Sequence, residues 1–260
     1  MIESSTNKQI KKIKQLQKKS KTRDEYKEFV IEGIKMYEEI PADKIVATYI
    51  SESFFKEKSD LHRNIIREYE VVKDDIFLEI CETMTPQGII AVVKQPEYSL
   101  SDILDKGMSK IIILDDLRDP GNLGTIMRTA EGAGFDAVIL SKSSVDMFNP
   151  KVVRSTMGAI YRVPFIYEDD LKTAINDTYK KAGYTIYSAY LDGAVDYTRT
   201  EYSDKTAIVI GNEANGISDE VIGVSDVLIK IPMSGQVESL NAAVSAAVIM
   251  YEVRRQTTVW

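Results

Sequence analysis

Apolar stretches, each long enough for one buried strand, recur through the second half of this 260-residue chain. Polar segments with helical periodicity separate them. Continuous apolar strands that alternate with helices are typical of a parallel sheet covered on both faces. The pattern predicts a doubly wound α/β domain over residues 107–260. Its strands are expected at 110–115, 137–140, 185–189, 207–210 and 227–231, and its helices at 122–131, 150–157, 170–182, 217–224 and 239–256.

A smaller α/β unit is predicted upstream, over residues 1–97. Strand-like runs occur at 29–33, 44–50, 69–72 and 89–93, and helical segments lie between them. The polar, proline-containing stretch that follows favours a linker at 98–106. The sequence therefore predicts two domains of unequal size.

Composition excludes several kinds of chemistry. The chain has one cysteine, Cys81, and one histidine, His62. A disulfide within the chain is impossible, and zinc sites built from thiolate or imidazole lack ligands, so no metal is expected. His62 lies in a polar stretch with no nucleophile signature, which favours a solvated surface residue. No apolar run approaches the roughly 18 residues of a membrane helix, and the N-terminus resembles no secretion signal, so we expect a cytoplasmic protein without a membrane span.

Charge is concentrated at the N-terminus. Residues 1–23 carry seven lysines and Arg23 against one acid, Glu3, a net charge of +7, whereas the whole chain has −7, so the remainder sums to −14. Ile10, Ile13 and Leu16 have helical spacing, which predicts an amphipathic helix with an exposed lysine face. Such a face fits RNA and fits an ordinary solvated helix equally well. The candidate RNA contacts are Lys11, Lys12, Lys14, Lys18, Lys19 and Arg23, together with Arg154, for which a structural surface role is as good an interpretation.

Three strand-end loops are candidates for a site, because ligands of parallel sheets bind beyond the carboxyl ends of the strands. In the first loop, Asn122 can cap a helix whose Gly124 and Arg128 share one face. The second is bracketed by Gly211 and Gly216, and the third runs into the closing helix. Taken singly, each loop also fits a common turn or helix cap. None contains the GxGxxG fingerprint, which counts against a dinucleotide-dependent oxidoreductase.

Taken together, the three loops resemble the SpoU (TrmH-type) family of RNA ribose 2′-O-methyltransferases, in the SPOUT class. The matching pieces are Asn122-x-Gly124-x-x-x-Arg128, Gly211-Asn212-Glu213 with Gly216, and Ile231-Pro232-Met233 through Ser239-Leu240-Asn241. Ala214 departs from the glycine of many members. A weaker resemblance, through 29–33 and 85–88, links the first 97 residues to the family's substrate-binding domain, an α/β RNA-binding fold shared with certain ribosomal proteins.

The resemblance implies S-adenosylmethionine as methyl donor, a ribose 2′-hydroxyl of RNA as acceptor, a C-terminal trefoil knot and a homodimer. Ribosomal RNA is favoured over transfer RNA by the accessory domain. The implied catalytic residues are Arg128, Asn122, Glu213, Ser239 and Asn241, and the implied cofactor-binding residues are Gly211, Ile231, Leu240, Met233, Val209 and Ile210.

The role of Arg128 stays open at this point, because a guanidinium is protonated at all ordinary pH values and is a poor base. It either stabilises the developing alkoxide or holds a neighbouring phosphate. The alternative function is a non-catalytic RNA- or ribosome-binding protein that retains the fold.

Overall fold

The computed structural model describes residues 1–57, 66, 68–104, 107 and 109–257, and the contacts between them divide the chain into two compact units. Unit 1 comprises Met1–Pro96 and Asp146–Tyr161, and unit 2 comprises Glu97–Val145 and Arg162–Trp260. The segment Asp146–Tyr161 thus groups with the N-terminal unit, although the sequence pattern joined it to the second domain. His62 lies outside the described residues.

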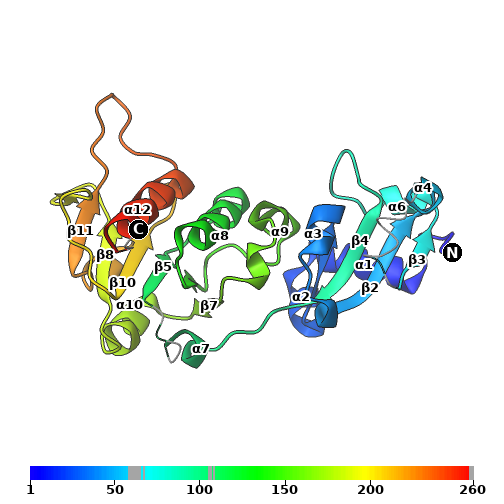
Figure 1. The fold of residues 1–260 in the computed structure, drawn as a ribbon, viewed down its shortest axis with the longest axis horizontal. Coiled ribbons are helices and arrows are strands. Elements are labelled where there is room, and N and C mark those ends of the chain that lie inside the picture. The colour runs from blue at the N-terminus through cyan, green and yellow to red at the C-terminus, as the bar shows by residue number, and fades with distance from the viewer. Residues whose placement is uncertain (58–65, 67, 105–106, 108, 258–260) are drawn as a thin grey trace. The chain divides into compact units, whose positions relative to one another are not determined.

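Unit 1 is built on a four-stranded sheet with the order β1-β4-β2-β3 (Figure 1). Its strands are β1 (Glu28–Glu32), β2 (Ile45–Ser51), β3 (Glu70–Val72) and β4 (Ile89–Lys94). β4 is antiparallel to both neighbours, whereas β2 and β3 are parallel. The helices are α1 (Lys8–Lys18), α2 (Ser20–Tyr26), α3 (Ile34–Glu38), η1 (Ala42–Lys44), α4 (Glu52–Glu57), α6 (Asp74–Leu78), α9 (Pro150–Thr156) and η2 (Ala159–Tyr161).

The predicted amphipathic helix near the N-terminus is confirmed as α1. Ile10, Ile13 and Leu16 are fully buried and share a core cluster with Val30 and Val92 of the sheet. Burial of a side chain of this size contributes about 1.5–3 kcal/mol. The basic segment is therefore anchored to unit 1 by its apolar face, and its lysines occupy the remaining faces.

Unit 2 contains a seven-stranded sheet with the order β7-β6-β5-β10-β8-β11-β9, and every neighbouring pair is parallel. The strands are β5 (Lys110–Leu114), β6 (Ala137–Ser141), β7 (Phe165–Glu168), β8 (Thr185–Ala189), β9 (Val195–Asp196), β10 (Thr206–Ile210) and β11 (Val227–Lys230). The predicted parallel α/β sheet is confirmed. The sequence pattern missed β7 and β9, which are the short edge strands and are only partly buried.

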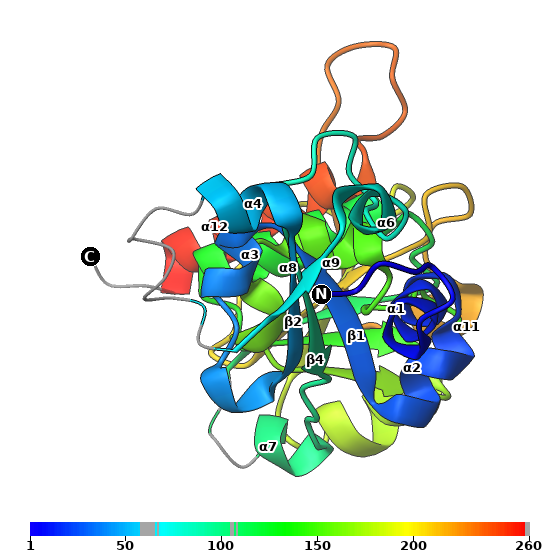
Figure 2. The same ribbon diagram turned by 90° about the vertical axis from the view of Figure 1, so that its right-hand side faces the viewer.

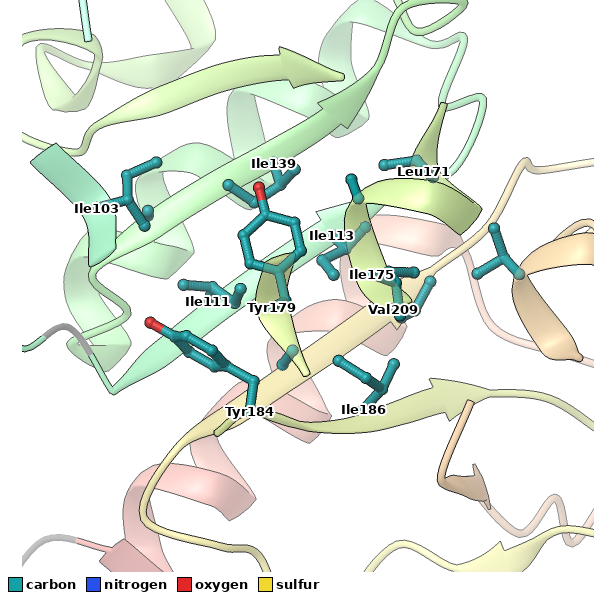
Figure 3. Close-up of a cluster of buried hydrophobic side chains, with 14 of the residues drawn as sticks. Ile103, Ile111, Ile113, Ile139, Leu171, Ile175, Tyr179, Tyr184, Ile186 and Val209 are labelled. Atoms are coloured by element: carbon teal, nitrogen blue, oxygen red, sulfur yellow. The ribbon is translucent and has the colours of Figure 1, made fainter. Parts of the chain in front are cut away.

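Helices cover both faces of this sheet. On one face, Ile111, Ile113 and Val209 pack against α10 (Leu171–Ala174) and η3 (Ile175–Tyr179), with Tyr179 at the centre of the cluster (Figure 3). α8 (Pro120–Ala133) and α12 (Ala242–Thr257) pack together beside the same sheet. α11 (Asp219–Ile222) and α7 (Leu100–Leu104) complete the unit.

The segment predicted as a linker, residues 98–106, contains a short helix that packs against unit 2. Part of it forms α7, whose Ile103 is fully buried in the cluster of Figure 3. Apolar burial explains the difference, since Leu100, Ile103 and Leu104 have a helical spacing that the flanking polar residues obscured. Among the described residues, no helix has the length and apolar character needed to cross a membrane.

Candidate active site

The three loops singled out in the sequence leave the carboxyl ends of β5, β10 and β11. β5 and β10 are adjacent in the sheet although four strands separate them in the chain. The chain proceeds outward from β5 to β6 and β7 on one side, and β10 adjoins β8 on the other. A sheet that changes direction in this way leaves a crevice at the switch point, where ligands of α/β proteins bind.

The first loop turns sharply and then starts α8. Asp116 has φ +55°, a left-handed conformation that an aspartate can adopt at modest cost. Asp119 is the N-cap of α8, and its side chain accepts a hydrogen bond from the backbone N–H of Asn122 at 2.8 Å. The prediction that Asn122 caps this helix is therefore wrong, since Asp119 already serves that N–H. Asn122 lies in the first turn instead, buried, and its side-chain amide is free for other contacts.

The second loop closes on itself through two backbone hydrogen bonds between Asn212 and Gly216, of 2.9 and 3.0 Å. A Cβ atom on Gly211 would lie 2.2 Å from the carbonyl carbon of Gly216, so only glycine fits there. The side chain of Asn212 accepts from the N–H groups of Ala214 and Asn215, and it donates to the backbone oxygen of Asp116 at 2.8 Å. This loop is thus rigid and fixed to the first loop.

Glu213 joins the second loop to the start of α8. Its carboxylate accepts from the backbone N–H groups of Arg118 (3.3 Å) and Asp119 (3.2 Å) and from Nδ2 of Asn122 (2.8 Å). Partial burial works against ionisation, but the donated hydrogen bonds outweigh it and lower the pKa of Glu213. Glu213 is therefore an ionised acceptor at neutral pH.

The third loop contributes Asn241, just before α12. Its Oδ1 accepts from the backbone N–H groups of Ala243 (2.9 Å) and Val244 (3.3 Å), which satisfies the start of the helix. Its Nδ2 therefore points away from the start of α12 and donates to Oδ1 of Asn122 at 3.0 Å. Asn241, Asn122 and Glu213 form one directed chain of hydrogen bonds, hereafter the relay, which unites all three predicted loops.

A cavity of about 670 Å³ adjoins the relay. Glu213 and Asn241 line it directly, and so does Ser239. Five of the six predicted cofactor contacts also line it: Ile210, Gly211, Ile231, Met233 and Leu240. Val209 does not. Side chains alternate along a strand, so Val209 points into the core of Figure 3 while Ile210 faces the cavity.

Of the predicted catalytic residues, Arg128 alone belongs neither to the relay nor to the cavity lining. It lies on α8 roughly 9 Å further along the helix axis than Asn122. Its side chain is exposed and forms no hydrogen bond or ion pair with any residue that the structure describes. The loop between Pro232 and Ser239 is also exposed, and both views show it projecting from unit 2 (Figures 1 and 2).

The candidate RNA contacts of unit 1 other than Arg23 divide into three groups. Lys11, Lys18 and Lys19 are exposed and have no ion pair with a described residue. Lys12 pairs with Glu28 and Lys14 with Glu79, both at 2.6 Å. Arg154 is half-buried, and its side chain makes no hydrogen bond with a described residue.

Arg23 requires a correction. Its guanidinium is buried, donates to the carbonyl oxygens of Leu16 and Gln17, and pairs with Asp146 at 2.5 Å. With its donors engaged inside unit 1, it cannot serve as a phosphate contact. The charge count could not separate it from its solvated neighbours.

Sequence reasoning also missed residues of the site. Residues 189–192, at the carboxyl end of β8, line the cavity, and the same strand-end rule applied to 185–189 would have found them. Asp115 is buried and accepts from the backbone N–H (2.8 Å) and hydroxyl (2.7 Å) of Ser218, which fixes the far end of the second loop. No local signal marks this contact, because the two residues are more than one hundred positions apart.

Comparison with known proteins gives a consistent picture. Residues 109–251 match the model of the SpoU rRNA Methylase family, and residues 7–91 match an MRM3-like substrate binding domain. Among curated proteins, the 23S rRNA (guanosine(2553)-2′-O)-methyltransferase RlmP of Bacillus subtilis (strain 168) is 35% identical over 254 residues, which are 97% of this chain and 98% of the relative.

Two solved structures with bound cofactor are also similar. One is an AdoMet-bound rRNA methyltransferase from Sinorhizobium meliloti, with a TM-score of 0.83, 28% identity and coverage of 99% of this chain and 98% of that chain. The other is the SpoU methyltransferase AviRb from Streptomyces viridochromogenes in complex with AdoMet, with a TM-score of 0.82, 25% identity and coverage of 96% and 98%.

Proposed function

This chain belongs to the SpoU rRNA Methylase family, and we infer that it is an enzyme that transfers a methyl group from S-adenosylmethionine to a ribose 2′-hydroxyl of RNA. The relay carries this conclusion, because Glu213 and Asn241 of the second and third family loops line one cavity, and Asn122 of the first loop is hydrogen-bonded to both of them. The acceptor that we propose is ribosomal RNA, as in the relative from Bacillus subtilis, which matches this chain over nearly its whole length.

The cavity is suited to S-adenosylmethionine. Its volume lies within the roughly 300–1,000 Å³ usual for small-molecule sites. Ile210, Ile231 and Leu240 give it apolar walls for an adenine ring, and the backbone at Gly211 lies at its edge without a side chain in the way. These residues would hold the cofactor, which supplies an electrophilic methyl group on a sulfonium when bound.

The relay and Arg128 are assigned different tasks. Asn122, Glu213 and Asn241 fix one another, so they orient the acceptor nucleotide without first rearranging. Ser239, exposed on the cavity wall, is a further contact for the nucleotide. The guanidinium of Arg128, which has no ion pair with a described residue, stabilises the developing alkoxide or holds the adjacent phosphate, and removal of Arg128 lowers turnover strongly under either role.

We further propose a homodimer with a trefoil knot in the C-terminal part of unit 2, as the family resemblance implies. Val237, Val244 and Tyr251 support the dimer, because they expose 61%, 47% and 51% of their surface near or on α12. A cytoplasmic location follows from the proposed ribosomal substrate. We also propose domains at 1–97 and 107–260 joined by a linker at 98–106, and the family matches over residues 7–91 and 109–251 support this proposal.

The decisive experiment is transfer of labelled methyl groups from S-adenosylmethionine to total RNA from a strain that lacks the gene. We expect one labelled ribose in ribosomal RNA, located by fragment mapping, and strongly slowed labelling with Arg128→Ala. Label in transfer RNA would exclude the proposed substrate. RNA binding without cofactor binding or transfer would instead identify a non-catalytic RNA-binding protein.

A further inference from the structure

Unit 1 contains a cavity of its own, of about 460 Å³. It lies between α4, α6 and the loop that leads into β4, and Figures 1 and 2 both show these segments at the same end of the sheet. Strand directions explain the meeting point, since β2 and β3 end where the antiparallel β4 begins. The proposed methyl-transfer chemistry of unit 2 gives this cavity no task.

The walls of the cavity present apolar groups to solvent. Phe54 and Pro86 line it, and Leu78 exposes 59% of its surface there. Gly88 allows α4 to approach the loop, because a Cβ atom at this position would lie 2.6 Å from Cβ of Phe54, and φ is +78°. An aromatic ring and two apolar side chains around a small hollow suit a flat ligand that stacks.

The polar groups of the cavity have unused capacity. Oδ1 of Asp74 accepts from the backbone N–H (2.9 Å) and hydroxyl (3.0 Å) of Ser53, but its Oδ2 has no hydrogen-bond partner among the described residues. The side chain of Glu57 likewise forms no hydrogen bond or ion pair with them. Oε1 of Gln87 accepts from the N–H of Ile34 at 2.8 Å. The amide NH₂ of Gln87 has no hydrogen-bond partner among the described residues.

These groups indicate the edge of a nucleobase as the ligand. The described lining residues include two carboxylates and no lysine or arginine, so a phosphate would be repelled. A carboxylate binds two neighbouring N–H groups well, and guanine presents N1–H and N2–H₂ side by side. An amide NH₂ suits the O6 acceptor of the same base. Adenine would direct its N1 acceptor toward a carboxylate, which is unfavourable.

We propose that this cavity binds an unpaired guanine base of the RNA substrate, with Asp74 or Glu57 on the N1–H and N2–H₂ edge and Phe54 against the ring. The proposal rests on the proposed function, because it takes RNA as the ligand. It assigns to unit 1 a preference for one base, in addition to the general attraction of its lysines for phosphates.

The test uses the full chain and three single-stranded RNA nonamers at one fixed salt concentration. All three are oligoadenosine, with a central guanosine, inosine or adenosine. We expect the guanosine strand to bind about tenfold more tightly than the adenosine strand. Inosine lacks the 2-amino group and should lie between them. Equal affinities for the three strands would overturn the proposal.

A matched pair of variants locates the effect. Asp74→Asn keeps the oxygen that Ser53 needs but replaces the unused oxygen with a donor, so the guanosine preference should shrink to within about twofold. Asp75→Asn removes the neighbouring carboxylate, which pairs with Lys73 outside the cavity, and should leave the preference unchanged. Equal loss of the preference in both variants would refute the assignment.

Thermal unfolding and cofactor binding are measured on every variant, so that misfolding is recognised. Should Asp74→Asn unfold, Glu57→Gln provides the same test on a side chain that forms no hydrogen bond or ion pair with a described residue. Methyl transfer to ribosomal RNA is measured separately. Transfer without a guanosine preference contradicts only the base site, whereas a preference without any transfer contradicts the proposed function.

Discussion

The loop cluster of unit 2 and the outer surface of unit 1 use their polar side chains in opposite ways. In unit 2, hydrogen bonds join Asn122 to Glu213 and to Asn241, and Asn212 and Asp115 anchor the same loops. In unit 1, Lys11, Lys18 and Lys19 have no ion pair with a described residue. The difference separates two tasks: a site for chemistry has its geometry fixed in advance, whereas a surface for a polyanion keeps its charges available.

Gly211→Ala should have the largest effect, because it disrupts the loop cluster of unit 2, whose geometry is fixed in advance. The new Cβ would overlap the backbone at Gly216, so the second loop cannot close. We expect cofactor binding, measured by calorimetry, to fall at least 100-fold. Gly235→Ala is the matched control, since a Cβ there meets nothing within 4 Å and the loop is exposed. Normal binding by Gly211→Ala would mean that the loop is adaptable after all.

Arg128→Ala should lower kcat by about 10²–10³-fold, the usual cost of removing one preorganised donor from a developing oxyanion. Cofactor affinity should not change, because Arg128 does not line the cavity. Single-turnover methyl transfer and calorimetry separate the two quantities. Arg128→Lys sharpens the result, since partial activity indicates that charge suffices, while full loss indicates that the two-pronged guanidinium geometry is needed. A comparable loss of activity in Arg255→Ala, on the surface of α12, would remove the special status of Arg128.

Arg23→Met tests a buried basic residue of the N-terminal segment. Like the side chains of the relay, the Arg23 guanidinium is held by hydrogen bonds inside the protein. The substitution would leave the Asp146 carboxylate and the carbonyl oxygens of Leu16 and Gln17 without their donor. We expect a loss of about 3 kcal/mol in the free energy of unfolding, measured by urea denaturation. Lys21→Met, on the exposed side of α2, should cost almost nothing. A variant that is stable but binds RNA weakly would restore Arg23 as a phosphate contact.

The same two regions show which features of the structure could be predicted from the sequence. Continuous apolar strands predicted the parallel sheet, and helical spacing predicted α1, because burial of these side chains dominates local structure. The relay was predicted through the family resemblance as a set of residues, but not as a chain of hydrogen bonds. Its hydrogen bonds join residues up to 119 positions apart, which no periodicity reports. Arg23 was misjudged for the same reason, because Asp146 lies 123 positions away.

Replacement of Lys11, Lys18 and Lys19 by alanine tests the outer surface of unit 1, and a smaller effect on RNA binding is expected. Each lost phosphate contact should reduce the slope of log affinity against log salt concentration by about 0.7–0.9. Affinity for ribosomal RNA fragments, measured by filter binding, should fall a few-fold at moderate salt. Replacement of Lys12 and Lys14 should change the slope less, because Glu28 and Glu79 already neutralise them. Equal slopes in both variants would show that these ion pairs open freely on RNA binding.

The smallest effect is expected from the acid dependence of the relay. The pKa of Glu213 is lowered from its ordinary 4.5, so its ionised form stabilises the fold above that value. This contribution must disappear as pH falls through the lowered, folded-state pKa, when the carboxylate takes up a proton. The thermal midpoint of the wild type should therefore exceed that of Glu213→Gln at neutral pH, and the two should converge in acid. Glu238→Gln, an exposed neighbour on the cavity wall, should follow the wild type throughout. The idea fails if the thermal midpoints of wild type and Glu213→Gln differ by the same amount at every pH. The charge of Glu213 would then add nothing to the hydrogen bonds that it accepts, and amide contacts alone would hold the geometry of the relay.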